Sequence, residues 1–164
     1  MFAYKIVMVG DFATGKTSLI RRFIDNSFSE EYLSSIGVSI SKKILGDSTM
    51  IIWDIEGRTE FKPIFKQYLS GAKGFIIVAD LTRKGTIESI KDHINTALSV
   101  VSDAPICIAL NKSDVKSDFS VDIEEIKGLS TNIISVFKTS ALNGDAVEDL
   151  FKQLNAKIVK DLKC

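Results

Sequence analysis

Residues 10–17 of this 164-residue chain read GDFATGKT, and they restrict its fold more than any other stretch. They follow a short apolar run at residues 3–9, which predicts a buried strand, and they open a helical pattern over residues 16–25. Glycine, four residues and then Gly-Lys-Thr between a strand and a helix is typical of a phosphate-binding loop. Backbone N–H groups in such a loop point at phosphate oxygens, with the helix dipole behind them. The stretch therefore predicts a strand–loop–helix unit that binds phosphate.

The rest of the chain alternates between strand-like and helix-like patterns. Further apolar runs typical of strands lie at residues 38–45, 50–55, 74–80, 105–110 and 133–137. Gly-Asp-Ser at residues 46–48 predicts a hairpin turn between the first two of these runs. The alternation predicts an α/β fold of the P-loop NTPase type, with a mainly parallel six-stranded sheet, one antiparallel edge strand and helices on both faces. Ligands of such sheets bind beyond the carboxyl ends of the strands.

Apolar residues at helical spacing predict the remaining helices. Asp122 precedes Glu125 by three residues, and Asp145 precedes Glu148 by three, which is a spacing typical of helix N-termini. His93 is the one histidine and has no cysteine beside it, so we interpret it as a surface or boundary side chain rather than a metal ligand. The apolar residues at helical spacing form two sets, one in each predicted helix. The first set is Ile87, Ile90, Ile94, Ala97 and Leu98, and the second is Val147, Leu150, Phe151, Leu154 and Ile158.

Composition limits the class of protein. Lys+Arg and Asp+Glu both number 21, so the chain lacks the basic excess that a generic nucleic-acid-binding protein needs. No apolar run approaches the length of a membrane span. Two cysteines cannot cross-link a chain of this size, and Cys107 is interpreted as a small core residue, so we expect a reduced, cytoplasmic protein. The length predicts a single domain over residues 1–164.

Two short motifs follow the last two predicted strands: NKSD at residues 111–114 and TSA at residues 139–141. Each motif is weak by itself, but both stand in order with others at fixed spacings. With these motifs the chain resembles the small GTPases of the Ras superfamily, and the Rab branch most closely, over residues 3–160. The other motifs that carry the resemblance are SIGV at 35–38, WDIEG at 53–57, YLSGAKG at 68–74 and DLT at 80–82.

The resemblance implies a molecular switch in vesicle trafficking that binds GTP or GDP with Mg²⁺ and hydrolyses GTP to GDP and phosphate. Lys16 would reach the β- and γ-phosphates, and the Gly57 N–H would touch the γ-phosphate. The hydroxyls of Thr17 and Ser35 would ligate Mg²⁺, and Asp54 would hold it through water. The other residues expected around the phosphates are Asp11, Phe12, Ala13, Thr14, Gly15 and Ser18.

The NKSD and TSA motifs imply selection of guanine. Asp114 would accept hydrogen bonds from the N1–H and 2-amino groups of guanine, which adenine does not offer there. Asn111 and the backbone N–H of Ala141 would hold the guanine oxygen and its loop, and the Lys112 stem would lie on the base face. Phe28 would pack on the base from another side, with a plain core aromatic as the alternative. Ser140 and Leu142 complete the expected set.

Residue 58 departs from the family pattern. Arg58 stands where the family has the glutamine that orients the attacking water, and arginine has five donors and no acceptor. We therefore expect slow intrinsic hydrolysis. The alternative is that Arg58 acts as its own arginine finger while Glu56 places the water. The predicted catalytic set is Lys16, Glu56, Gly57 and Arg58.

Two residues of the phosphate loop depart as well. The large ring of Phe12 would crowd the γ-phosphate and any inserted arginine of an activating protein, unless it turns to solvent or packs on the second switch. Ala13 stands where the family commonly has glycine. If this residue needs a positive φ, alanine costs about 1 kcal/mol and would loosen the loop, so we expect faster nucleotide release than is usual.

The resemblance also implies partners. We expect a monomer that meets effector proteins through its switch regions and is regulated by an exchange factor and an activating protein. It would be peripheral on endomembranes only if Cys164 is lipidated. Two other classes stay open: a GTP-locked binding module that recruits effectors without turnover, and a P-loop kinase. The kinase is disfavoured because NKSD and TSA select guanine and no arginine-rich lid segment is visible.

Overall fold

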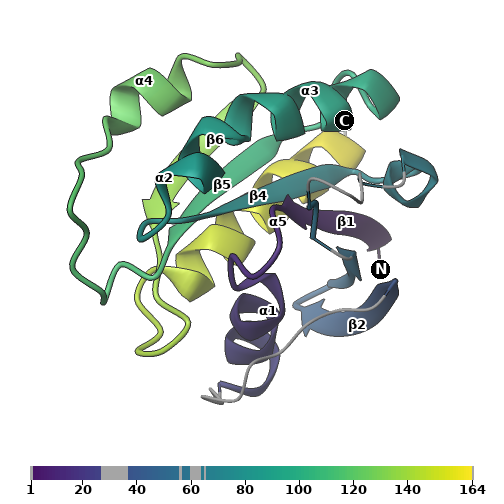
Figure 1. The fold of residues 1–164 in the computed structure, drawn as a ribbon. Coiled ribbons are helices and arrows are strands. Elements are labelled where there is room, and N and C mark those ends of the chain that lie inside the picture. Colours follow the sequence, from purple (N-terminus) through teal and green to yellow (C-terminus); the bar gives the residue numbers. More distant parts are fainter. Residues whose placement is uncertain (1, 27–36, 56, 60–63, 65, 164) are drawn as a thin grey trace.

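The computed structural model describes residues 2–26, 37–55, 57–59, 64 and 66–163 (Figure 1). Their strands form a six-stranded sheet in the order β2-β3-β1-β4-β5-β6. Neighbouring strands are parallel except β2 and β3, which are antiparallel. The predicted sheet, mainly parallel with one antiparallel edge strand, is thus confirmed. The strands are β1 (Phe2–Gly10), β2 (Val38–Leu45), β3 (Ser48–Ile55), β4 (Gly74–Asp80), β5 (Ile106–Asn111) and β6 (Ile133–Lys138).

Helices cover both faces of this sheet (Figure 1). Successive side chains of β1 alternate between two cores: Ile6 and Met8 pack with residues of α1 and α5, and Val7 and Val9 pack with residues of α3. Continuous apolar runs are therefore needed in the central strands, which are buried on both faces. The helices are α1 (Lys16–Asp25), α2 (Lys84–Glu88), α3 (Ile90–Val100), α4 (Ile123–Lys127) and α5 (Val147–Lys163), with a 3₁₀ turn at Lys66–Leu69.

The two predicted helix starts have different outcomes. The Asp122 side chain accepts hydrogen bonds from the N–H groups of Glu124 and Glu125 and caps α4, as the spacing predicts. The start at Asp145 is wrong, because Ala146 has a φ of 59° and α5 begins at Val147. The left-handed residue ends the preceding loop, so the helix opens two residues beyond Asp145.

Other sequence-based expectations hold with small shifts. The hairpin turn is shorter than predicted, because β3 already begins at Ser48 and Gly46 has a φ of 63°. Cys107 is fully buried in β5, which confirms it as a core residue. Among the described residues, no helix has the length and apolar character that crossing a bilayer would require.

Candidate functional site

The chemistry-bearing residues predicted from sequence converge at one edge of the sheet. Parallel strands end at the same edge, so the segments after β1, β3, β4, β5 and β6 are neighbours there. Asp54 lies in the last residues of β3, Asp80 ends β4 and Asn111 ends β5. All three side chains are buried at this edge. The phosphate-binding loop between β1 and α1 lies in the middle of the group.

Three successive carbonyl groups of the loop, those of Phe12, Ala13 and Thr14, each accept a hydrogen bond from a side chain outside it. Because a trans peptide points its carbonyl and its N–H to opposite sides, these bonds direct the following N–H groups toward the inside of the loop. An inward set of N–H groups is a site for an anion. The donors are, in the same order, Arg83 Nη2 at 2.6 Å, Lys112 Nζ at 3.3 Å and Asn111 Nδ2 at 3.0 Å.

Lys16 supplies the positive charge of this loop. Its side chain is buried, and its Nζ donates to the Asp11 carbonyl at 3.2 Å. Burial lowers the pKa of Lys16 to about 8, although the nearby carboxylates of Asp54 and Asp11 act in the opposite direction. A desolvated ammonium at the base of inward N–H groups fits a phosphate, because a nearby anion would stabilise the charge that burial deprives of water.

Two oxygen-bearing side chains lie beside Lys16. Thr17 Oγ1 donates to Asp54 Oδ2 at 2.5 Å, and Asp54 is buried. Hydroxyl and carboxylate oxygens are ligands that Mg²⁺ prefers. The pair therefore fits a magnesium ion next to the phosphate position. Ser35, the third predicted ligand, lies outside the described residues, as do Phe28 and Glu56.

Two glycines allow the segments at this edge to approach closely. Gly15 has a φ of 102°, and an added Cβ would lie 2.2 Å from Asn111 Nδ2. A Cβ on Gly57 would lie 2.6 Å from the Cα of Phe12. Gly57 is thus packed against the backbone of the phosphate loop, and its contact with a γ-phosphate stays a prediction. Any side chain at either position would push the segments apart.

The predicted base-binding residues form one hydrogen-bonded unit. Ser140 Oγ donates to Asp114 Oδ1 at 2.7 Å, and Thr139 Oγ1 donates to Asn111 Oδ1 at 3.1 Å. Lys112 has a φ of 66°, and its Nζ lies 2.8 Å from Asp80 Oδ2. These bonds tie the segment after β5 to the segment after β6 and to the end of β4. Ala141 is buried and Leu142 is exposed beside this unit, and Ser18 lies in the first turn of α1.

A family model described as "Ras family" matches residues 5–160. The chain belongs to this family. The chain is 35% identical to "Ras-related protein Rab-1" of Theileria parva, with 98% of this chain and 76% of that relative covered. It is 29% identical to "Ras-related protein Rab-4A" of Rattus norvegicus, with 99% and 77% covered. It is 33% identical to "Ras-related protein Rab-11C" of Dictyostelium discoideum, with 93% and 71% covered.

These likenesses identify a Rab-like small GTPase of the Ras superfamily, as the motifs predicted. Small GTPases of this family act as switches that bind GTP or GDP with Mg²⁺, and they meet effector, exchange and activating proteins. The side of the phosphate loop that faces α3 holds Arg58, as the following contacts show.

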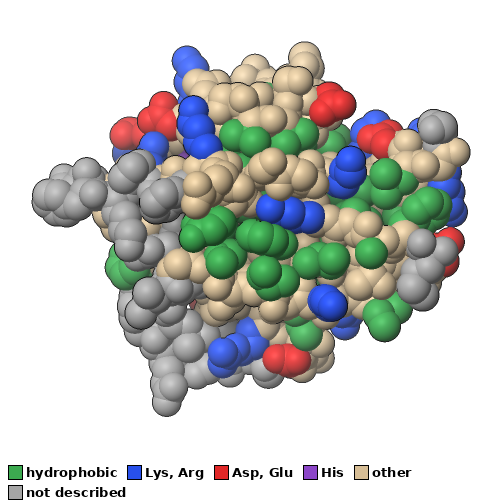
Figure 2. All heavy atoms as spheres, turned by 90° about the vertical axis from the view of Figure 1, so that its right-hand side faces the viewer, with side chains coloured by type: hydrophobic (Ala, Val, Ile, Leu, Met, Phe, Trp, Pro, Cys, Tyr) green, Lys and Arg blue, Asp and Glu red, His purple; other side chains and the backbone are tan. Residues whose placement is uncertain are grey.

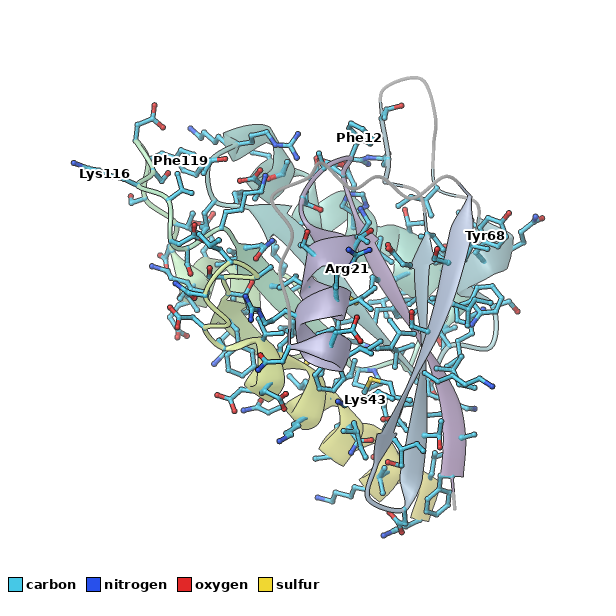
Figure 3. The ribbon with its side chains drawn as sticks, turned by 90° about the horizontal axis from the view of Figure 1, so that it is seen from below. Phe12, Arg21, Lys43, Tyr68, Lys116 and Phe119 are labelled. Atoms are coloured by element: carbon cyan, nitrogen blue, oxygen red, sulfur yellow. The ribbon has the colours of Figure 1, made fainter. Side chains whose placement is uncertain are left out.

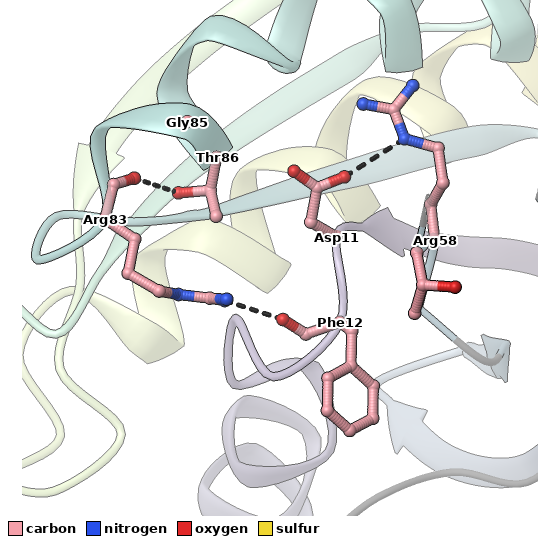
Figure 4. Close-up of a pocket in the computed structure, with 7 residues that line it drawn as sticks. Asp11, Phe12, Arg58, Arg83, Gly85 and Thr86 are labelled. Carbon is pink, nitrogen blue, oxygen red and sulfur yellow. Dashed lines mark hydrogen bonds and ion pairs between the residues drawn. The ribbon is translucent and has the colours of Figure 1, made fainter. Parts of the chain in front are cut away.

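Arg58 is held on that side. Its Nε lies 3.1 Å from Asp11 Oδ1, and its Nη1 lies 3.6 Å from Asp92 Oδ2 in α3. Its backbone pairs with the phosphate loop, because the Arg58 N–H donates to the Gly10 carbonyl and the Phe12 N–H donates to the Arg58 carbonyl, both at 3.0 Å. Figure 4 shows the Arg58 side chain and the Phe12 ring running in opposite directions. Phe12 is 40% exposed and lies beyond the N-terminal end of α1 (Figure 3).

The interpretation of His93 as a surface or boundary side chain is wrong. His93 is 1% exposed, and its Nε2 lies 2.9 Å from Asp11 Oδ1. The ring is buried because position 93 shares the inner face of α3 with Ile90, Ile94 and Ala97, and the loop carboxylate satisfies its polar edge. The spacing of three residues to Ile90 and of four residues to Ala97 was the signal in the sequence that pointed to burial.

Arg83 is a second site residue that sequence reasoning missed. Besides its bond to the Phe12 carbonyl, its Nε donates to Asp80 Oδ2 at 3.1 Å. Its charge also lowers the pKa of Lys16, though less than burial does. The only signal in the sequence is its place directly after the DLT motif. Arg83 lines a cavity of about 680 Å³ beside the loop (Figure 4), together with Asp11, Phe12, Arg58, Thr59, Gly85 and Thr86.

Proposed function

We propose that this chain is a Rab-like switch that binds guanine nucleotides with Mg²⁺ at the carboxyl edge of its sheet, hydrolyses GTP slowly and acts in vesicle trafficking. The observation that carries the proposal is the loop of residues 10–17. Its buried Lys16 lies beside the Thr17–Asp54 pair, and outside side chains hold its carbonyls outward. Family membership supplies the class of nucleotide and the class of reaction.

The phosphate half of the site uses the chain's own N–H groups and one ammonium group. Lys16 binds the β- and γ-phosphates, and the inward N–H groups from Ala13 to Gly15 surround them. Thr17 would ligate Mg²⁺ and Asp54 would hold it through water, and the ion would neutralise charge that develops on the phosphates. Gly57 contributes its N–H to the γ-phosphate from the loop backbone on which it packs. Loss of this phosphate would release the switch segments.

The base half of the site selects guanine. Asp114 accepts from the two guanine donors, and Ser140 orients its carboxylate from the other side. Asn111 ties this recognition to the phosphate half, because the same side chain donates to the Thr14 carbonyl. A bound adenine would offer Asp114 no donors on the side of the base, so the carboxylate would keep only its bond from Ser140 while the base shields it from water, which is costly.

Slow hydrolysis follows from Arg58 and Phe12. The guanidinium of Arg58 is bound to Asp11 and has no acceptor with which to orient water. The same anchor argues against the arginine-finger alternative for this conformation. Phe12 adds bulk beside the γ-phosphate position. Ala13 has a φ of 62°, so the strain expected for alanine is present, and faster nucleotide release remains part of the proposal.

Effector proteins would meet the switch segments and the neighbouring edge of the sheet. The edge strand β2 exposes Ile40 and Ile44 to solvent. On β3, the Trp53 ring lies 6.4 Å from the Tyr68 ring and under the ammonium of Lys5. Figure 2 shows hydrophobic side chains gathered on one face, with lysine and arginine side chains among them. We take the chain to be a monomeric single domain, peripheral on endomembranes if Cys164, which lies outside the described residues, is lipidated.

The nucleotide that co-purifies with the protein tests this function and separates it from the GTP-locked alternative. The purified chain is denatured, and the released nucleotide is identified by ion-exchange chromatography. GDP supports a hydrolysing switch, and retained GTP supports the locked module. Failure of the Mg²⁺-supplied protein to bind labelled GTP in preference to ATP would overturn both.

A further inference from the structure

One carboxylate links the phosphate loop to two other parts of the molecule. Asp11 Oδ1 accepts from Arg58 Nε, in the segment after β3, and from His93 Nε2, in α3, at 3.1 and 2.9 Å. The Asp11 side chain is 18% exposed, so water screens these contacts only weakly. Three segments that are far apart in the sequence therefore meet at a single oxygen atom beside the triphosphate position.

Among the residues that the structure describes, the His93 imidazole has a single polar contact with which to act at this junction. A carboxylate only accepts, so Nε2 must carry the proton of the imidazole. The other ring nitrogen, Nδ1, is buried and has no hydrogen-bond partner among the described residues. Within the described part of the chain, the imidazole is therefore linked to the polar groups of the site through Asp11, and the rest of its helix face is apolar.

The position of the Arg58 side chain is independent of the position of its backbone. The paired backbone bonds between Arg58 and the loop hold the main chain whether or not the guanidinium is bound. An arginine side chain has several rotatable bonds, so a guanidinium released from the α3 side can turn away from it while the backbone stays in place. Asp11 and the more exposed Asp92 hold it on the α3 side, away from the Phe12 ring (Figure 4).

We propose that His93 is a positioning residue: by fixing the Asp11 carboxylate, it keeps the Arg58 guanidinium against α3 and withholds that positive charge from the terminal phosphate. The proposal rests on the function proposed above. A guanidinium that reaches the terminal phosphate stabilises the charge of the transition state, and one anchored elsewhere does not. His93 thereby lowers the rate of hydrolysis without touching the nucleotide.

Single-turnover GTP hydrolysis tests the proposal. His93→Phe keeps an aromatic ring in the core but removes the donor to Asp11, and we expect the rate to rise about five-fold, a small part of what a fully placed arginine supplies. His93→Gln, whose amide can donate to Asp11, should return the rate to within two-fold of the parent. In an Arg58→Ala background, His93→Phe should leave the rate of hydrolysis unchanged. Asn95→Ala, at an exposed position of α3 away from Arg58, is the matched control and should leave the hydrolysis rate within two-fold of the parent.

A spectroscopic readout follows Arg58 without turnover. In protein labelled with ¹⁵N-arginine, the Nε–H signal that disappears in Arg58→Ala belongs to Arg58. In the parent we expect this proton to exchange slowly, because it donates to a carboxylate that is mostly shielded from water. In His93→Phe the signal should move to the position of a solvent-exposed arginine and exchange fast. In His93→Gln it should stay where it is in the parent.

A rate that is unchanged or lower in His93→Phe, a rise that persists in the Arg58→Ala background, or an Arg58 signal that does not move would each overturn the proposal. If His93→Phe does not fold, Asp11→Asn serves in its place, since it removes the charge that holds Arg58 and should move the same signal. Labelled GTP binding is measured on every variant. Loss of binding by the parent would overturn the proposed function itself, whereas intact binding with unchanged rates would overturn only the role of His93.

Discussion

The two ends of the nucleotide site are built differently. At the base end, Asn111, Lys112 and Asp114 follow the family pattern, and each makes a bond that ties the segments together. At the terminal-phosphate end lie Phe12 and Arg58, the two residues to which we attribute slow hydrolysis. There Arg58 is bound by Asp11 and α3 instead of pointing at the phosphates. In the function that we propose, binding of the nucleotide and its hydrolysis therefore depend on separate sets of residues.

Asp114→Asn should weaken base recognition, and we expect it to have the largest effect of the variants considered. The amide loses one acceptor for the guanine donors and also the charge that Ser140 orients, so we expect GTP affinity to fall by at least about 100-fold. Equilibrium binding of fluorescent GTP and XTP measures it, and XTP should gain affinity. An equal loss of affinity for GTP and XTP would show that the base does not bind at Asp114. Asp118→Asn, an exposed aspartate in the segment after β5, is the control.

Arg58→Gln should sharpen the contrast at the other end. Glutamine restores an acceptor for the attacking water and leaves the paired backbone in place, so we expect single-turnover hydrolysis to rise about ten-fold while GTP affinity changes less than two-fold. Lys66→Gln, which removes a positive charge from the exposed 3₁₀ turn, is the control. An unchanged or slower rate would remove Arg58 as the cause of slow turnover.

Arg83→Ala tests the link between the two ends. The variant loses the donor that holds the Phe12 carbonyl outward, so the N–H of Ala13 is less well oriented, and we expect nucleotide to dissociate about five-fold faster. Stopped-flow release of fluorescent GDP measures this rate. Lys84→Ala removes the next positive charge in the sequence from an exposed position and should leave the rate within two-fold. Equal rates in both variants would show that the Phe12 carbonyl needs no such donor.

The smallest expected effect is a pH dependence of stability at Asp11. Burial favours a higher pKa for this carboxyl, but hydrogen bonds from His93 and Ser89 and the charges of His93 and Arg58 outweigh it and hold the pKa below the usual 3.8. Its stabilising contribution is therefore complete above about pH 4 and lost as pH falls through the lower folded-state pKa. Urea unfolding from pH 6 to pH 3 should show a shallower loss for Asp11→Asn than for the parent. An equally steep loss of stability with falling pH in the parent and in Asp11→Asn would contradict this role of Asp11.

Much of the fold could be predicted because it depends on short-range patterns. The phosphate loop, α1, β2 and β4 were placed from the order of apolar, glycine and polar residues within about ten positions. The start of α5 was misplaced, because acidic residues three apart favour a helix start without revealing the left-handed conformation of Ala146. The individual roles at the site rest on family resemblance, and the geometry brings the described members of that set together.

The sequence by itself determined the strand–helix order, the phosphate loop and the class of nucleotide switch, because local spacing and ordered motifs carry that information. Only the tertiary structure decided what lies against the loop from outside. His93 and Arg83 reach it across 82 and 71 positions of sequence. A polar side chain acquires its role from the partner that burial brings to it, and that partner is set by how helices pack on the sheet rather than by neighbours along the chain.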